Sequence, residues 1–368
     1  MGLANTCHDE RTEVQLIEPK DAVRSIPSGA TVIVGGSGAG HSLPQLFIDT
    51  LAEVYQEEGQ PRDLTTVRVV GIGDFADRGF SQLAIPGLMR RTIGSNIGNE
   101  PRLGELVERG EVEAYSFPQG VLSQLCREIA AGRPGLVTRV GLDTYVDPRQ
   151  TGGKQGIATE ELVEVLELAG EEWLFFRAFP IDVSVIRGST IDEDGNLTME
   201  EEAVKGEMLA MAMAARNSGG TVIAQAKRLA ARGSMPSRSV MVPGALIDLA
   251  YLDPEQTQTY ATGYSPYYSG ELRRPAAASD ESLPLDVRKV IARRSLLEFE
   301  PGDICNLGFG ISQSIGAIAW EEGISDRLIL TVEQGIFGGV PVAGNEGGAG
   351  FNFQAMIDQP YMFDFYDG

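Results

Sequence analysis

Cysteine and histidine are scarce in this sequence, and their scarcity excludes several kinds of site. The 368 residues include three cysteines and two histidines. Cys7, Cys126 and Cys305 are far apart and odd in number, so neither a disulfide framework nor a metal-ligand spacing is indicated. We therefore expect no metal site, and we expect a reducing, cytoplasmic location. A Ser/His/Asp or Cys/His catalytic triad has little support because so few histidines are available.

The sequence also lacks a long apolar run and an excess of positive charge. No run of about 18 apolar residues occurs, and the polar start has no signal core, so we expect no membrane association. Lys and Arg number 30 against 52 Asp and Glu, which gives a net charge of −22. This balance argues against nucleic acid as a partner.

An anionic ligand would need a local concentration of basic side chains on such an acidic protein. The basic residues that cluster in the sequence are Arg273, Arg274, Arg288, Lys289, Arg293 and Arg294. An ordinary solvated helix face would have the same composition, so both interpretations stay open.

Alternating strands and helices favour an α/β fold with a mainly parallel sheet in each of two halves. The 45 glycines suit many tight turns between strands and helices. We expect a first domain over residues 1–253, a linker over 254–284 and the start of an incomplete second domain over 285–368. Each half repeats the pattern of strand, glycine loop, helix and strand, although the residues themselves differ.

A glycine-rich loop follows the first expected strand, over residues 30–34. Gly35, Gly36 and Gly38 belong to this loop, and a helix opened by a Ser-Leu-Pro sequence comes after it. Glycine loops that lead into a helix can hold an anion or a thioester ligand. The spacing does not match the usual dinucleotide fingerprint.

A carboxylate stands at the end of a later strand. The apolar run over residues 328–332 reads as a buried strand, and Glu333 follows it directly, before a turn that contains Gly338. In α/β sheets the carboxyl ends of strands are where ligands bind, and glycines let the backbone approach a ligand closely. Local sequence alone favours the simpler interpretation of Glu333, as a solvated residue at the end of a strand.

The segment Thr331–Pro341 resembles the active-site segment of class I coenzyme A transferases, in particular the propionate and acetate CoA-transferase branch. The similarity extends from about residue 23 to residue 368. Further segments with strong similarity are Gly141–Lys154, Glu171–Gly188, Arg288–Arg294, Asn306–Gly310 and Ile357–Gly368. One departure is Asn345-Glu346, which replaces an apolar pair in the family pattern and could alter the acyl preference.

The resemblance implies an enzyme that moves coenzyme A (CoA) between a short-chain acyl-CoA and a free carboxylate. Glu333 would be the nucleophile, and a glutamyl-CoA thioester the intermediate, so CoA is both substrate and covalent intermediate. Gln119 would lie near the thioester, although a polar residue at a helix start is an equally simple reading. Asn306, Gly308 and Gly310 are candidates to orient Glu333 and the oxyanion.

The sequence ends inside a segment that continues in the family. The resemblance therefore implies a homo-oligomer, or a complex with a chain that supplies the remaining C-terminal part. Two other functions stay open: an acyl-CoA hydrolase on the same scaffold, and a non-catalytic subunit that binds CoA or another metabolite. The expected partners are acyl-CoA and small carboxylates.

Overall fold

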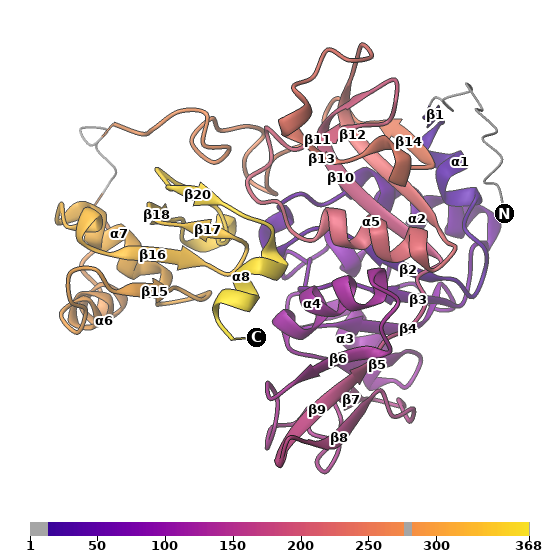
Figure 1. The fold of residues 1–368 in the computed structure, drawn as a ribbon, viewed down its shortest axis with the longest axis horizontal. Helices are drawn as coiled ribbons and strands as arrows, with labels where there is room; N and C mark the ends of the chain where they lie inside the picture. The colour runs from indigo at the N-terminus through magenta and orange to yellow at the C-terminus, as the bar shows by residue number, and fades with distance from the viewer. Residues whose placement is uncertain (1–13, 276–281, 368) are drawn as a thin grey trace, which may run out of the picture.

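The computed structural model describes residues 14–275 and 282–367 (Figure 1). Most of the first 252 residues surround one large sheet, and the last 86 or so surround a smaller one. The path of the large sheet is β1-β14-β12-β10-β2-β3-β4-β5-β7, and all its neighbours are parallel except β5 and β7. The predicted α/β fold with a mostly parallel sheet is confirmed.

The strands of this sheet are β1 (Gln15–Leu16), β2 (Thr31–Val34), β3 (Leu64–Val67), β4 (Met89–Gly94), β5 (Glu113–Ser116), β7 (Lys154–Gln155), β10 (Val183–Asp192), β12 (Thr221–Ala230) and β14 (Leu249–Leu252). Two short strands, β11 (Leu197–Thr198) and β13 (Val240–Val242), extend it beside β10. Every residue of β10 is buried, as is usual for a central parallel strand covered on both faces.

Helices cover both faces of the large sheet. They are α1 (Pro19–Arg24), α2 (Gln45–Glu58), α3 (Pro101–Glu108), α4 (Gln119–Ala130) and α5 (Met208–Asn217). Successive side chains of a strand point to opposite faces. Ile33 accordingly packs in the apolar cluster that contains α4 and α5, whereas Val32 and Val34 pack with α1, α2 and α3. The sheet is therefore the middle layer of three.

A separate antiparallel sheet lies below the large one in Figure 1. It consists of β6 (Gly135–Thr138), β8 (Val163–Leu168) and β9 (Glu171–Arg177), in the order β6-β9-β8. Phe117, beside α4, packs edge-on against Phe176 of β9 with ring centroids 5.3 Å apart. This contact joins the small sheet to the main core.

The C-terminal part contains a mixed sheet in the order β15-β16-β17-β20. Its strands are β15 (Ile304–Asn306), β16 (Ile329–Val332), β17 (Ile336–Phe337) and β20 (Ala355–Met356), and the pair β18 (Val340–Pro341) and β19 (Gly350–Phe351) lies beside it. The helices are α6 (Val287–Leu296), α7 (Gln313–Glu321) and α8 (Gln359–Phe365). Among the described strands of this part only β15 and β16 are parallel, so the expectation of a mainly parallel sheet was wrong for the second half. β17 is antiparallel because it folds back from β16 through a tight turn.

The two parts contact each other through α8 and α4, which lie next to each other in Figure 1. Asp364 of α8 accepts a hydrogen bond from Gln124 Nε2 (2.9 Å) and one from Arg127 Nη2 (2.7 Å). Short 3₁₀ turns occur at Gly38–Gly40, Gly79–Ser81, Ser237–Ser239, Gly244–Leu246, Ser325–Arg327 and Gly344–Glu346. In the part of the chain that the model describes, no helix is long and apolar enough to cross a bilayer.

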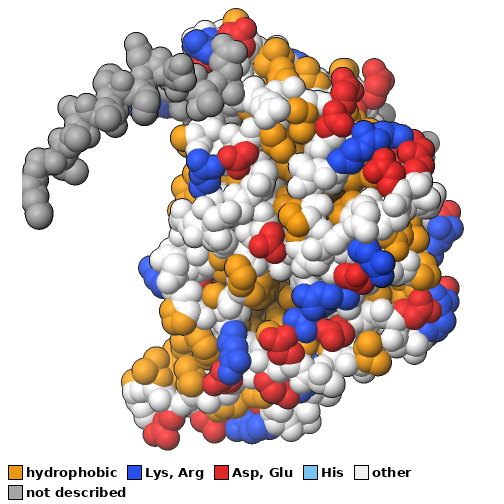
Figure 2. All heavy atoms as spheres, turned by 90° about the vertical axis from the view of Figure 1, so that its right-hand side faces the viewer, with side chains coloured by type: hydrophobic (Ala, Val, Ile, Leu, Met, Phe, Trp, Pro, Cys, Tyr) orange, Lys and Arg blue, Asp and Glu red, His pale blue; other side chains and the backbone are white. Residues whose placement is uncertain are grey.

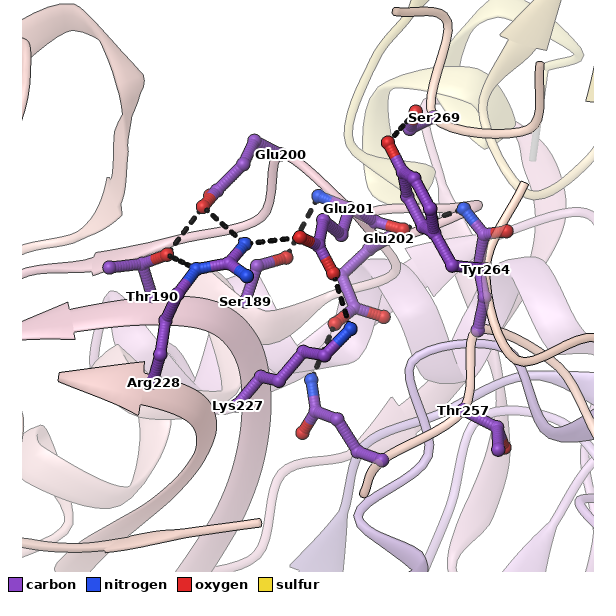
Figure 3. Close-up of polar contacts among 12 residues, drawn as sticks. Ser189, Thr190, Glu200, Glu201, Glu202, Lys227, Arg228, Thr257, Tyr264 and Ser269 are labelled. Carbon is purple, nitrogen blue, oxygen red and sulfur yellow. Dashed lines mark hydrogen bonds and ion pairs between the residues drawn. The ribbon is translucent and has the colours of Figure 1, made fainter. Parts of the chain in front are cut away.

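The segment 253–274, which leads toward the second part, has no α-helix or strand but is held firmly to the large sheet. Arg187 Nη2 donates to Thr257 O (2.6 Å), and Gln258 Nε2 donates to Glu201 O (2.6 Å). In Figure 3 the Glu201 carboxylate lies between the cations of β12, with Lys227 Nζ at 2.8 Å. This network covers the part of β10 and β12 that extends beyond β2, and leaves the ends of β2 to β5 open.

Candidate active site

A cavity of about 780 Å³ lies where the carboxyl ends of β2 to β5 meet the carboxyl ends of β15 and β16. The large sheet contributes Gly38, Ala39, Val70, Gly71, Gly73, Asp74, Phe75, Arg78, Asn96, Gly98, Asn99 and Gln119. The C-terminal part contributes Leu307, Phe309, Gln313, Val332, Glu333, Gln334, Gly344, Asn345, Gly347 and Gly348. Tyr260 and Ala261 of the connecting segment complete the lining. A ligand in this cavity would therefore touch both parts of the protein.

Glu333 enters the cavity directly from the end of β16. The chain reverses immediately afterwards, because Gly335 has a φ of +107° and a Cβ there would lie 2.1 Å from Ile357 O. Gln334 Nε2 donates to Glu333 Oε1 (3.1 Å), whereas Oε2 of Glu333 is buried without a hydrogen-bond partner. Burial raises the pKa of Glu333, and the Gln334 hydrogen bond opposes that rise. The result is a partly desolvated carboxylate with one oxygen free.

Two amide side chains in the lining, one from the loop after β4 and one from α4, also have a buried polar atom without a hydrogen-bond partner. Asn99 Nδ2 donates to Gly71 O (2.8 Å) and Gly73 O (3.2 Å), which leaves Asn99 Oδ1 buried without a donor. Gln119 is the first residue of α4, and its Nε2 is buried without an acceptor. Buried polar atoms are normally satisfied, so these atoms are suited to hydrogen bonds with a ligand.

Two aromatic rings of the lining stack on each other at the solvent-exposed edge of the cavity. Phe75 and Phe309 stack with ring centroids 5.9 Å apart and an interplanar angle of 25°. They belong to loops after β3 and β15, so the pair spans from one sheet to the other. Both rings remain mostly exposed, at 62% and 66%. Large exposed rings at a cavity are suited to cover an apolar part of a ligand.

Tyr260 forms a further wall and is fixed from several sides. Its hydroxyl donates to Ile72 O (2.5 Å), and its backbone N–H donates to Ala39 O (2.8 Å). Arg78 Nη1 donates to Tyr260 O (2.9 Å), and the guanidinium lies 5.5 Å from the ring centroid. Arg78 is the one basic side chain in the described lining, against the carboxylates of Asp74 and Glu333. The cavity is therefore slightly acidic.

The sequence-predicted residues divide into two groups. Glu333, Gln119 and Gly38 line the cavity together, as their places at strand ends would require. Gly35 and Gly36 lie beneath it: a Cβ on Gly35 would lie 2.6 Å from Met208 Sδ, and a Cβ on Gly36 would lie 2.8 Å from Leu43 Cδ1. Packing thus explains both of these glycines.

The remaining candidates lie near the cavity but outside its lining. Asn306 is exposed at the end of β15, and Gly308 and Gly310 flank the lining residue Phe309. Gly308 O accepts from Ser312 Oγ (2.6 Å). Gly338 lies in the turn after β17, against Gln354. The roles of Asn306, Gly308 and Gly310 in orienting Glu333 and the oxyanion stay predictions, as does a role of Gly338 in binding the substrate.

Sequence reasoning missed Asn99, Phe75, Tyr260 and Phe309. A signal was available for Asn99 and Phe75, because each follows a strand of the parallel sheet, as Glu333 does. Tyr260 comes from the segment expected to be a linker, where no local pattern places a residue in a site.

The predicted cluster of basic residues does not line the cavity. Lys289 is buried, and its Nζ pairs with Glu321 (2.7 Å), while Arg293 pairs with Glu322 (2.7 Å) and Arg294 with Glu298. On the face drawn in Figure 2, acidic and basic side chains are likewise intermixed and form no broad basic patch. Among the described residues, no group of three or more His, Cys, Asp or Glu side chains is placed to hold a metal ion.

Comparisons with known proteins agree with this geometry. The family model described as Coenzyme A transferase matches residues 17–250. The caffeate CoA-transferase of Acetobacterium woodii is 41% identical over 358 residues, which cover 96% of this chain and 68% of that protein. The acetate CoA-transferase YdiF of Escherichia coli (strain K12) is 39% identical over 359 residues, covering 96% and 67%.

A solved structure extends the similarity to three dimensions. The crystal structure of acyl-CoA transferase YdiF from E. coli O157:H7, as a thioester complex with CoA, superposes with a TM-score of 0.90 at 37% identity. The match covers 97% of this chain and 67% of that one. This chain thus spans about two thirds of the length of each of these three relatives.

Proposed function

Since this chain belongs to the coenzyme A transferase family, we propose that it moves CoA between a short-chain acyl-CoA and a free carboxylate, with Glu333 as the covalent carrier. The observation that carries this proposal is the free, buried Oε2 of Glu333, at a strand end that faces a large cavity. A nucleophilic carboxylate needs one oxygen that no neighbour occupies, and it needs limited contact with water.

The reaction would proceed in balanced steps. The Glu333 carboxylate attacks the acyl carbonyl of the thioester, CoA leaves as the thiolate, and a mixed anhydride forms. The thiolate then attacks the glutamyl carbonyl, which releases the acid as a carboxylate and leaves CoA on Glu333 as a thioester. An acceptor carboxylate repeats the two steps in reverse and leaves as the new acyl-CoA. Over the whole cycle one thioester and one carboxylate are replaced by another thioester and another carboxylate, so the net transfer is close to balanced in free energy.

Each attack creates a negatively charged oxygen that a nearby donor must stabilise. Gln119 Nε2, buried and without an acceptor, is the candidate donor on the large sheet. Asn99 Oδ1 is a buried acceptor in the same cavity, suited to an N–H group of the pantetheine arm of CoA. Together they would hold a thioester substrate in front of Glu333.

The proposed substrate has one carboxyl group and an uncharged tail. The described lining contains Asp74 and Glu333 but one cation, Arg78, which is already bonded to Tyr260 O. A second carboxylate on the substrate would meet a lining with more negative than positive charge, in which Arg78 is the one possible ion partner. The transfer rates with monocarboxylates and with dicarboxylates of equal length test this point, and equal rates would contradict it.

Intact-mass spectrometry tests the main proposal. The natively purified protein is measured before and after incubation with propionyl-CoA. The expected result is a gain equal to the mass of CoA less water, mapped to the peptide that contains Glu333 and removed by added acetate. Steady release of free CoA that does not depend on acetate would indicate a hydrolase instead.

We further propose that the protein acts as an oligomer or in a complex. Exposed apolar side chains gather on α6, around it and on β15, which is the edge strand of its sheet: Leu285, Val287, Val290, Ile291, Leu297 and Ile304. Exposed apolar side chains on one helix and on an edge strand favour coverage by another chain. Light scattering after size exclusion would give the mass, and Val290→Lys should lower it if this face is the interface.

A further inference from the structure

His41 connects the two parts of the protein immediately behind the cavity. Its side chain is fully buried, and Nε2 lies 3.0 Å from Gly347 O. A carbonyl oxygen can only accept, so Nε2 carries the proton and donates. His41 follows β2 in the large sheet, whereas Gly347 belongs to the C-terminal part, 306 positions later. Nδ1 is then the unprotonated nitrogen, and it is buried without a partner.

The histidine holds a glycine loop that lies against the support of Glu333. A Cβ placed on Gly348 would lie 3.1 Å from His41 Nε2 and 3.4 Å from Gln334 Cδ. The glycine therefore fills the gap between these two side chains. Gln334 in turn donates to the Glu333 carboxylate at 3.1 Å. The contacts form an unbroken path from the histidine to the proposed nucleophile.

The loop is also fixed on its other side. The Glu346 carboxylate accepts hydrogen bonds from Tyr268 OH (2.8 Å), from Thr259 Oγ1 (3.3 Å) and from the hydroxyl of Thr262. These three residues belong to the connecting segment. Glu346 is held by these hydroxyl groups and Gly347 by His41. The backbone of the loop 346–348 therefore has little freedom to move away from Gln334.

We propose that His41 positions Glu333 without touching it, by holding the glycine loop that supports Gln334. This inference rests on the proposed function, because it needs Glu333 to be the nucleophile. A small displacement of a nucleophile can lower a rate greatly, so a residue of this kind affects the chemical step more than substrate binding.

Burial keeps this donor uncharged. It lowers the pKa of His41 to about 4, so the ring is neutral at the pH of any ordinary assay. The hydrogen bond to Gly347 therefore stays the same from about pH 6 upward. If a His41 variant shifts the acid limb of the pH–rate profile, the shift must therefore come from a changed pKa of Glu333, the residue that His41 is proposed to position.

The experiment compares wild type with three variants of the full chain. His41→Leu has a similar volume but no donor, and His41→Gln retains an N–H at about the reach of Nε2. Tyr251→Phe is the matched control: it removes a buried hydrogen bond of the large sheet, to Gln225 Oε1 (3.0 Å), between two residues that do not line the cavity. Adduct formation with propionyl-CoA is followed by mass in single turnovers, alongside steady-state rates and the free energy of unfolding.

His41→Leu should slow both the adduct and kcat by roughly 10- to 100-fold, with KM for propionyl-CoA nearly unchanged. The acid limb of the pH profile should move upward, because the Gln334 hydrogen bond that favours the carboxylate is weakened. His41→Gln should recover most of the rate. The double variant Gln334→Ala/His41→Leu should lose no more rate than the more impaired of the two single variants, because both substitutions interrupt the same chain of contacts.

Four results would overturn the inference alone: a wild-type adduct rate in His41→Leu, an unmoved acid limb, additive effects of the two variants, or an equal loss in a Tyr251→Phe protein of matched stability. An adduct on a residue other than Glu333 would overturn this inference and the proposed function together. Should His41→Leu not fold, His41→Asn replaces it, since its shorter amide cannot reach Gly347 O.

Discussion

Arg68 and Glu100, both fully buried, form an ion pair that joins the loop after β3 to the loop after β4 beneath the cavity. Arg68 Nε donates to Glu100 Oε1 (2.9 Å), and Nη2 contacts the other carboxylate oxygen. Glu100 Oε1 also accepts the N–H of Ile72 (2.8 Å), and Arg68 Nη2 also donates to Asn96 O (3.1 Å). Two loops that line the site are thereby fixed to each other.

Breaking this pair from one side should destabilise the protein strongly. We expect Arg68→Met to lower the free energy of unfolding by about 3–5 kcal/mol, because the Glu100 charge would remain buried without a partner. Urea denaturation measures the change. The double variant Arg68→Met/Glu100→Leu should recover a large part of it, since no charge is then left buried. A loss below about 1 kcal/mol in the single variant would contradict the assignment.

The length of the Glu333 side chain should matter as much as its charge. Glu333→Ala should abolish transfer and the covalent adduct. Glu333→Asp should lose most of the activity, because shortening the side chain withdraws the carboxylate from the thioester. Single-turnover transfer from propionyl-CoA to acetate measures both. Asp74→Asn is the control: it also removes a carboxylate from the lining but should retain transfer. Full activity in Glu333→Ala would rule out the proposed mechanism.

The stacked rings at the exposed edge of the cavity should act as a pair. Phe75→Ala and Phe309→Ala should each raise KM for propionyl-CoA by roughly threefold to tenfold, with a smaller effect on kcat, if the rings cover the bound substrate. A double-mutant cycle should give a coupling free energy of about 0.5–1.5 kcal/mol. Leu168→Ala, which changes an exposed apolar residue of β8 outside the lining, is the control. Purely additive effects would mean that the rings act separately.

The buried carboxyl of Glu207 should make stability depend on pH. Burial raises its pKa from 4.5 to about 7, while the hydrogen bond from Ser123 Oγ (2.8 Å) opposes the rise. The folded state therefore retains a proton that the unfolded state has lost between pH 4.5 and 7. Its contribution to stability falls as the pH rises through this window and is constant above it.

We expect Glu207→Gln to remove that dependence. Urea denaturation from pH 5 to pH 8 should show the wild type losing up to ~3 kcal/mol relative to the variant. The variant retains the side-chain shape and a partner for Ser123, so the two curves should agree at pH 5. Parallel curves across the whole range would show that Glu207 does not hold its proton in the folded state.

Local pattern was sufficient to place Glu333 at the end of a buried strand, whereas its role as nucleophile was suggested by the family resemblance. The continuous apolar run before Glu333 is a buried strand, and the glycines after it form the tight turn that leaves the carboxylate at the strand end. The same logic placed Gly38 and Gln119 after strands of the first sheet. Such inferences succeed because a parallel strand covered on both faces has a recognisable composition and a functional end.

What the sequence could not provide was the partner of each polar residue. Arg68 and Glu100 read as ordinary charged residues near a strand and a helix, yet both are fully buried. Their pairing depends on which strands are neighbours, which local composition does not determine. Likewise a glycine loop does not reveal which members face a cavity. Gly35 leaves room for the packed Met208 side chain, whereas Gly38, three residues later in the same loop, lines the cavity.

The hydrogen bond between His41 and Gly347, over 306 positions, also has a consequence in time. Strands and helices of each part can form from contacts that are local in the chain, but the cavity exists only after both parts have docked. Contacts of such long range are closed late in folding. During refolding, the backbone circular dichroism should therefore return before the protein can bind acyl-CoA. The order of events in the cell would be the same: the chain would form its secondary structure before it could bind acyl-CoA.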